Sequence, residues 1–161
     1  MSGAGGHRIE VMHGVNLGML GRRDPQHYGA LTLDELERQV EAFAAELGME
    51  ARCFRTNSET EYVERLHELR ELVDGAILNP GAWTHYSWAI HDALEIAALP
   101  AVEVHLSDVV RREPWRSLSV IEDLCLESIR GKGVEGYRLA LERLKRHLEG
   151  EMTNGEQEGG T

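Results

Sequence analysis

Apolar residues along the chain follow two patterns, short continuous runs and longer stretches in which they recur every three or four residues. Short runs bounded by turn residues predict buried strands, and the longer spacing predicts amphipathic helices. Strands are expected at residues 9–12, 50–55, 76–78, 101–104 and 124–129. Helices are expected at residues 33–47, 59–72, 88–98 and 135–148. Thr32 and Ser58 stand where N-caps of the first two helices belong.

The order of these elements predicts the fold. Strands that alternate with helices require right-handed crossovers and build a parallel sheet covered on both faces. Five strands indicate an α/β, flavodoxin-like fold, a five-stranded parallel sheet whose ligands bind at the carboxyl ends of the strands. We expect one catalytic domain over residues 9–149, with a flexible start at 1–8 and a disordered acidic tail at 150–161.

Composition and charge narrow the possible functions. The 161 residues include two cysteines and no CxxC pair, which argues against a zinc knuckle or a disulfide framework. The net charge of −11 disfavours nonspecific binding of nucleic acid. No apolar run approaches the roughly 18 residues of a membrane span, and no signal peptide is evident, so we expect a cytoplasmic protein. The pairs Arg22–Arg23 and Arg111–Arg112 can still form a local basic pocket for a small anion.

A long glycine-rich connection, residues 13–31, follows the first expected strand. Its glycines have neither the GxGxxG nor the GxxxxGK[ST] spacing, so a nucleotide-binding loop is poorly supported. The cluster of Arg22, Arg23 and Tyr28 is more informative, because a nearby guanidinium favours the phenolate of a tyrosine and makes it a candidate general base. The alternative is a solvated arginine pair beside a packed tyrosine.

Polar residues also follow the third and fourth expected strands. Asn79, Thr84 and His85 offer donors and acceptors to a hydroxylated ligand, unless Asn79 serves only the turn and His85 is exposed. Glu103 and His105 are two residues apart and share one face of a strand, so the carboxylate can orient the imidazole as a general acid. A purely structural buried pair is the alternative.

Candidate anion-binding residues come next in the chain. Ser107 can present its hydroxyl and backbone N–H groups, and Arg112 and Arg116 can bind a carboxylate. Arginines in loops are also often only solvated. No set of His, Cys, Asp and Glu has a spacing typical of a metal site.

Several blocks of residues, in conserved order, resemble one family, the type II 3-dehydroquinate dehydratases. The resemblance runs from Ile9 to Leu148. Among the blocks that carry it are Gly-Val-Asn-Leu-Gly at 14–18, Ile-Leu-Asn-Pro-Gly at 77–81 and Glu-Val-His-Leu-Ser-Asp at 103–108. The other matching blocks are 19–29, 82–87, 91–94, 112–113 and 133–137.

The resemblance implies a flavodoxin-like homododecamer built from trimers, without metal or cofactor. Its reaction is the trans elimination of water from 3-dehydroquinate through an enolate, which gives 3-dehydroshikimate in the shikimate or quinate pathway. The implied catalytic residues are the base Tyr28, its partner Arg23, the water-holding Asn16, the general acid His105 and its orienting partner Glu103. The implied substrate-binding residues are Asn79, His85, Leu106, Ser107, Arg112, Arg116 and Asp92, the last reaching a neighbouring subunit's site.

The chain also departs from the family's usual pattern. His13 and Val15 replace an asparagine and a proline, His91 replaces an arginine, and Asp108 replaces an asparagine. The last expected strand, usually apolar, carries Glu127, Ser128 and Arg130. Three other hypotheses therefore stay open: a paralogue that dehydrates a related cyclic β-hydroxyketone acid, a non-catalytic relative, and a nucleotide-binding module of the same fold.

Overall fold

A five-stranded parallel sheet forms the centre of the computed structural model, which describes residues 6–28, 30–108 and 112–151 apart from the side chains of His27, Tyr28 and Glu151. The strands are β1 (Arg8–His13), β2 (Glu50–Arg55), β3 (Gly75–Asn79), β4 (Ala101–His105) and β5 (Glu127–Arg130). They lie in the order β2-β1-β3-β4-β5, which confirms the flavodoxin-like sheet. Residues 1–5 and 152–161, which belong to the ends expected to be flexible, lie outside the described residues.

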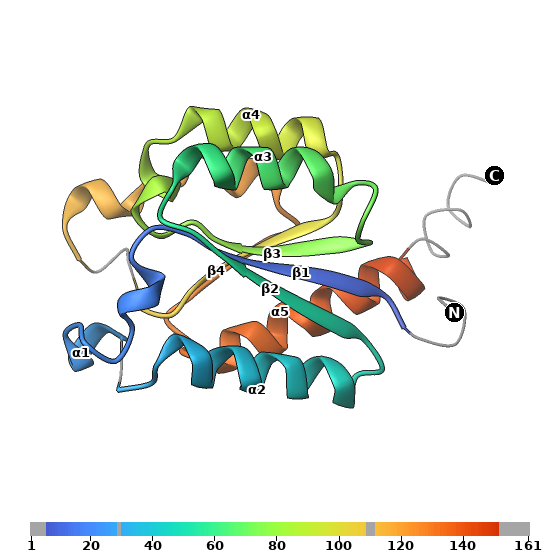
Figure 1. Ribbon diagram of the computed structural model, residues 1–161, viewed down its shortest axis with the longest axis horizontal. Coiled ribbons are helices and arrows are strands. Elements are labelled where there is room, and N and C mark those ends of the chain that lie inside the picture. Colours follow the sequence, from blue (N-terminus) through green and yellow to red (C-terminus); the bar gives the residue numbers. More distant parts are fainter. Residues whose placement is uncertain (1–5, 29, 109–111, 152–161) are drawn as a thin grey trace.

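Helices cover both faces of the sheet, with α2 and α5 on one face and α3 and α4 on the other (Figure 1). The helices are α1 (Pro25–Tyr28), α2 (Leu33–Glu46), α3 (Glu59–Leu69), α4 (Trp88–Ala97) and α5 (Glu135–Arg146). Two apolar cores result, because successive strand residues point to opposite faces: Val11 packs under α2 and α5, whereas Met12 packs under α3 and α4. Within the described chain, every helix is too short or too polar to cross a membrane.

The helix starts follow local capping chemistry. The Thr32 hydroxyl accepts a hydrogen bond from the Glu35 backbone N–H, and the Ser58 hydroxyl accepts one from Glu61. Each bond satisfies a donor that the first turn would otherwise leave unpaired. Both caps are the ones predicted from the sequence.

The last strand differs from the expectation. The apolar pattern predicts a strand at 124–129, but β5 begins at Glu127 and residues Glu122–Leu124 form a 3-10 turn. Leu124 and Cys125 pack instead against the core beneath α3 and α4. The register with β4 decides the position of β5, because among the described strands this edge strand pairs with β4 alone, and that pairing places Glu127 opposite Val102.

The long connection after β1 is also more structured than a plain loop. It contains a 3-10 turn, Leu17–Met19, and the short helix α1. The start of this connection packs against the segment that follows β3, where Gly81 has a φ of +66°. A Cβ at Gly81 would lie 2.5 Å from the Val15 carbonyl oxygen, so only glycine allows this approach.

His13, the last residue of β1, is completely buried, and neither ring nitrogen has a hydrogen-bond partner among the described residues. Nε2 of His13 lies 3.8 Å from Oε1 of Glu37, but that oxygen is already bound by Nη2 of Arg55 at 2.6 Å. Burial, reinforced by the positive charge of Arg55, lowers the pKa of His13 to about 4. The folded protein therefore resists protonation of His13.

We predict that this residue makes the fold acid-sensitive below pH 6.5. The unfolded chain binds a proton at His13 below its ordinary pKa of 6.5, whereas the folded chain does so only below about 4. Stability therefore falls as the pH drops through that window, by about 2 kcal/mol between pH 7 and pH 5. Urea unfolding at both pH values should show that His13→Asn lacks this loss. The exposed His67 provides the control, since His67→Asn should leave the difference unchanged. An equal loss in His13→Asn and the wild type would contradict the prediction.

Candidate active site

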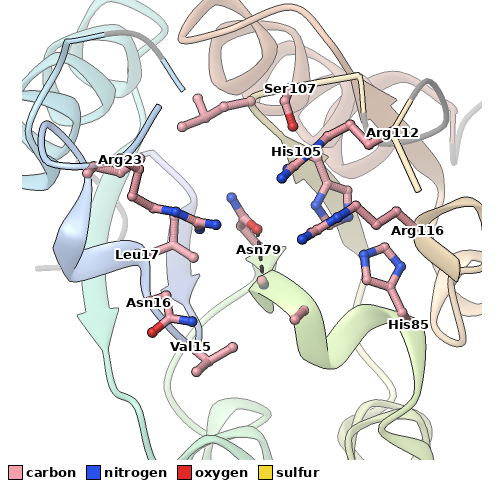
Figure 2. Close-up of a pocket in the computed structure, with 14 residues that line it drawn as sticks. Val15, Asn16, Leu17, Arg23, Asn79, His85, His105, Ser107, Arg112 and Arg116 are labelled. Atoms are coloured by element: carbon pink, nitrogen blue, oxygen red, sulfur yellow. Dashed lines mark hydrogen bonds between the residues drawn. The ribbon is translucent and has the colours of Figure 1, made fainter. Parts of the chain in front are cut away.

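A pocket opens at the carboxyl ends of β1, β3 and β4, next to the point where the strand order reverses (Figure 2). The loops after these three strands build its walls. The side chains that line it are those of Val15, Asn16, Leu17, Leu20, Arg23, Asn79, Ala82, His85, His105, Leu106, Ser107, Arg112 and Arg116, with Gly81 contributing backbone. The strand ends thus bring together most of the residues selected from the sequence.

The centre of the site is a buried carboxylate–imidazole pair at the end of β4. Nε2 of His105 lies 2.6 Å from Oε2 of Glu103, and both side chains are almost completely inaccessible to solvent. Because Nε2 is hydrogen-bonded to the carboxylate, the other ring nitrogen, Nδ1, is the one left for a ligand. This is the arrangement of an imidazole held in one orientation for proton transfer.

Hydroxyl groups surround the Glu103 carboxylate. Thr84 donates to Oε2, the Ser119 hydroxyl lies 2.8 Å from Oε1, and Ser128 donates to Oε1 at 3.2 Å. Burial alone would raise the pKa of Glu103, but the hydrogen bond and charge of His105, together with the bonds from Thr84 and Ser119, lower it to about 2. Glu103 is therefore ionised at neutral pH despite its burial.

Ser119 and Ser128 were not placed in the site from the sequence, and Thr84 was given a different role. Thr84 was expected to meet a ligand, but it is buried and its hydroxyl binds Glu103 instead. Ser119 carries no local signal, and both serines reach Glu103 only after three separate segments fold together. The one clue at Ser128 was that the last expected strand is polar at Glu127 and Ser128, where the family resemblance leads one to expect apolar residues.

Three arginines of the described chain face the pocket from two sides. Arg23 extends from the connection after β1, and Arg112 and Arg116 extend from the opposite wall, so that all three approach Asn79 and His105 (Figure 2). Arg116 is held in place by Glu113, whose carboxylate lies 2.6 Å from Nε, and by Trp115, over whose ring its guanidinium lies at 4.1 Å. Three guanidiniums around one small pocket favour an anionic ligand.

Asn79 and His85 are fixed by local hydrogen bonds. Oδ1 of Asn79 accepts a bond from the Gly81 N–H at 3.2 Å, and its Nδ2 donates to the Tyr137 hydroxyl at 3.4 Å. His85 is buried rather than exposed, and its Nδ1 donates to the Leu118 carbonyl at 2.7 Å, which leaves Nε2 as an acceptor. Burial is the main reason why the pKa of His85 is lowered, so this ring is neutral at pH 7.

Asn16 enters the pocket wall in a strained backbone conformation. Its φ is +69°, a left-handed value that asparagine tolerates better than most residues. The Asn57 side chain accepts a hydrogen bond from the Asn16 N–H at 2.8 Å and supports this turn. Such strain is often maintained at functional sites.

The structure does not bring every expected residue into the pocket. Asp92 is on α4, where its side chain is exposed and lies 3.0 Å from Nδ1 of His91. The side chain of Tyr28, and Arg111 as a whole, lie outside the described part of the chain. Leu106 and Ser107 both line the pocket, as expected from their position just after β4.

Fold and site together define an α/β enzyme that carries out acid–base chemistry on a small anionic molecule. Its sheet is flavodoxin-like, but the phosphate-binding glycine pattern is missing and the strand ends carry a carboxylate–imidazole pair and arginines instead. The chain belongs to the class II dehydroquinase family, whose model matches residues 7–145.

Individual relatives agree with this assignment. The chain is 50% identical over 135 residues to the 3-dehydroquinate dehydratase of Pelobacter propionicus. The matched region covers 83% of this chain and 91% of the relative. It is 46% identical over 142 residues to the enzyme of that name from Thermotoga maritima, covering 88% of this chain and 97% of the relative. The crystal structure of type II dehydroquinase from Propionibacterium acnes superposes with a TM-score of 0.83 at 38% identity, covering 87% of this chain and 97% of that one.

Proposed function

We propose that this protein is a hydro-lyase that converts 3-dehydroquinate into 3-dehydroshikimate and water, a reaction of the shikimate and quinate pathways. The observation that carries the proposal is the buried Glu103–His105 pair beside three arginines in a small pocket. Membership of the class II dehydroquinase family, whose relatives bear the name 3-dehydroquinate dehydratase, supports the choice of substrate.

The reaction requires a base on one side of the ring and an acid on the other. Tyr28, ionised with the help of Arg23, removes a proton from the carbon next to the ketone, and the electron pair moves onto the ketone oxygen. Asn16 holds a water that stabilises this enolate. The enolate then re-forms the ketone, a C=C bond forms, and the hydroxyl leaves as water with a proton from His105.

The remaining residues bind the substrate. Arg112, Arg116 and the segment around Leu106 and Ser107 contact the carboxylate, while Asn79 and His85 contact the ring hydroxyls. A charged carboxylate and several hydroxyls match a pocket lined by guanidiniums, by the amides of Asn16 and Asn79, and by the Ser107 hydroxyl.

The proposal includes a homo-oligomer, a dodecamer built from trimers, in which Asp92 reaches a neighbouring subunit's site. Trp88 and Ile96 support it, because these large apolar side chains are exposed on α4, the helix that also carries Asp92. Light scattering of the purified protein tests the assembly. A cytoplasmic location belongs to the same proposal.

Purified wild-type protein should turn over 3-dehydroquinate without any added cofactor. Dehydration creates a C=C bond conjugated with the ketone, so the reaction appears as a growing ultraviolet absorbance. The control is protein with His105→Ala, in which the signal should be lost. Folded wild-type protein that binds the substrate without turnover would instead point to a related cyclic β-hydroxyketone acid.

A further inference from the structure

Strand β5 places two polar residues directly beside the catalytic pair on β4. In the parallel register Ser128 lies opposite Glu103, and Arg130 lies opposite His105. These are two of the positions at which the last strand is polar although the family resemblance leads one to expect apolar residues. The proposed reaction uses neither of them.

A continuous set of hydrogen bonds connects the protein surface to Glu103. Nη2 of Arg130 donates to Oε2 of the exposed Glu122 at 3.2 Å, and its Nε donates to the Ser128 hydroxyl at 3.3 Å. The Ser128 hydroxyl lies 3.2 Å from Oε1 of Glu103. Thus four residues, from a surface carboxylate to the buried one, are linked through a single serine.

The chemistry of the donors fixes the direction of these bonds. A guanidinium can only donate, and an ionised carboxylate can only accept. The Ser128 hydroxyl accepts from Arg130, and its one proton is therefore directed at Oε1 of Glu103. Ser119 differs, because its hydroxyl lies within 3.3 Å of both Glu103 oxygens and of the Thr84 hydroxyl. Its proton can therefore be donated to more than one acceptor.

We propose that Ser128 and Arg130 are positioning residues for the catalytic pair. By holding Oε1 of Glu103, they set the rotation of the carboxylate and keep Oε2 aligned with His105, which lies 2.6 Å away. This inference rests on the proposed function. It assigns to edge strand β5 a part in the reaction, although neither residue lines the pocket.

The first test compares Ser128→Ala with Ser128→Thr in steady-state assays on 3-dehydroquinate. Loss of one hydrogen bond to a charged group should lower kcat about tenfold. KM should stay within about twofold, since Ser128 does not contact substrate. Threonine keeps the hydroxyl and suits a strand, so Ser128→Thr should restore most of kcat. Glu127→Gln, on the same strand but near Arg143, is the control and should leave kcat unchanged.

The second test is a double-mutant cycle with Arg130→Met. Because Arg130 acts through Ser128, its replacement should lower kcat a few-fold in the wild type and have no further effect in Ser128→Ala. Additive losses would overturn this relay, in which Arg130 acts on Glu103 through the Ser128 hydroxyl. So would an unchanged kcat in Ser128→Ala, or a loss of activity that threonine does not rescue. Arg130→Met reports on the relay independently if Ser128→Ala folds poorly.

A measurement without substrate separates this inference from the proposed function. In ¹⁵N-histidine-labelled, unliganded protein, the Nε2 resonance of His105 should move in Ser128→Ala and Arg130→Met but not in Glu127→Gln. A wild-type protein inactive on 3-dehydroquinate would defeat the proposed function while this shift still tested the relay. An unmoved resonance in both variants would refute the relay even if the enzyme is active.

Discussion

Replacement of His105 by alanine is expected to lower kcat on 3-dehydroquinate by about 10²- to 10⁴-fold, the usual contribution of a general acid. Hydroxide is a poor leaving group and requires a proton as its bond to carbon breaks. His105 is the imidazole at the end of β4, and its hydrogen bond to Glu103 directs Nδ1 away from the carboxylate. Steady-state ultraviolet assays of the purified variant measure the effect.

Substitution of the exposed His67 by alanine is the matched control and should leave kcat unchanged. Thermal unfolding of both variants checks that the fold is intact. Glu103 keeps its bonds from Thr84, Ser119 and Ser128 in His105→Ala, so the fold should survive the substitution. A loss of less than tenfold in a folded variant would remove His105 from the role of general acid.

Substitution of Tyr28 by phenylalanine should lower kcat by a similar factor, about 10²- to 10⁴-fold, because the variant lacks the group that takes the proton. The aromatic ring remains, so KM should change little. The control is Tyr86→Phe, which removes the hydroxyl of a tyrosine that is 59% exposed. The same steady-state assay compares the two variants. Equal activity of Tyr28→Phe and the wild type would exclude Tyr28 as the base.

Proton exchange in D₂O distinguishes the two roles. His105→Ala retains the base, so it should still form the enolate and exchange the proton next to the ketone, which NMR detects as loss of its signal. Tyr28→Phe should lose this exchange together with turnover. The opposite pattern would mean that the roles of base and acid are reversed.

Local physical chemistry explains why most of the fold was predictable. The period of apolar residues shows which face of a helix or strand is buried, and Thr32 and Ser58 show where two helices begin. The alternation of strands and helices then leaves few topologies other than the one observed. The start of β5 was not predictable in this way, because pairing with β4 outweighed the apolar run at Leu124 and Cys125.

In the candidate site, too, the features that depend on local spacing were predictable and those that depend on distant segments were not. Glu103 and His105 could be paired from the sequence, since a spacing of two puts both on one face of a strand. The gathering of Asn79, Arg23 and Arg116 was expected only because parallel strands end at one edge of the sheet. The burial of Thr84 and His85, and the bonds they make there, depend on segments distant in the chain.

The amino-acid sequence by itself determined the order of strands and helices, the edge of the sheet at which the candidate site lies, and the Glu103–His105 pair, because each depends on local spacing or on strand direction. Only the tertiary structure decided which hydroxyls hold Glu103, that His13 lacks a hydrogen-bond partner among the described residues, and that β5 joins the Glu103–His105 pair to Arg130. These contacts form between residues far apart in the chain, and their energies depend on burial and orientation, which a linear pattern does not contain.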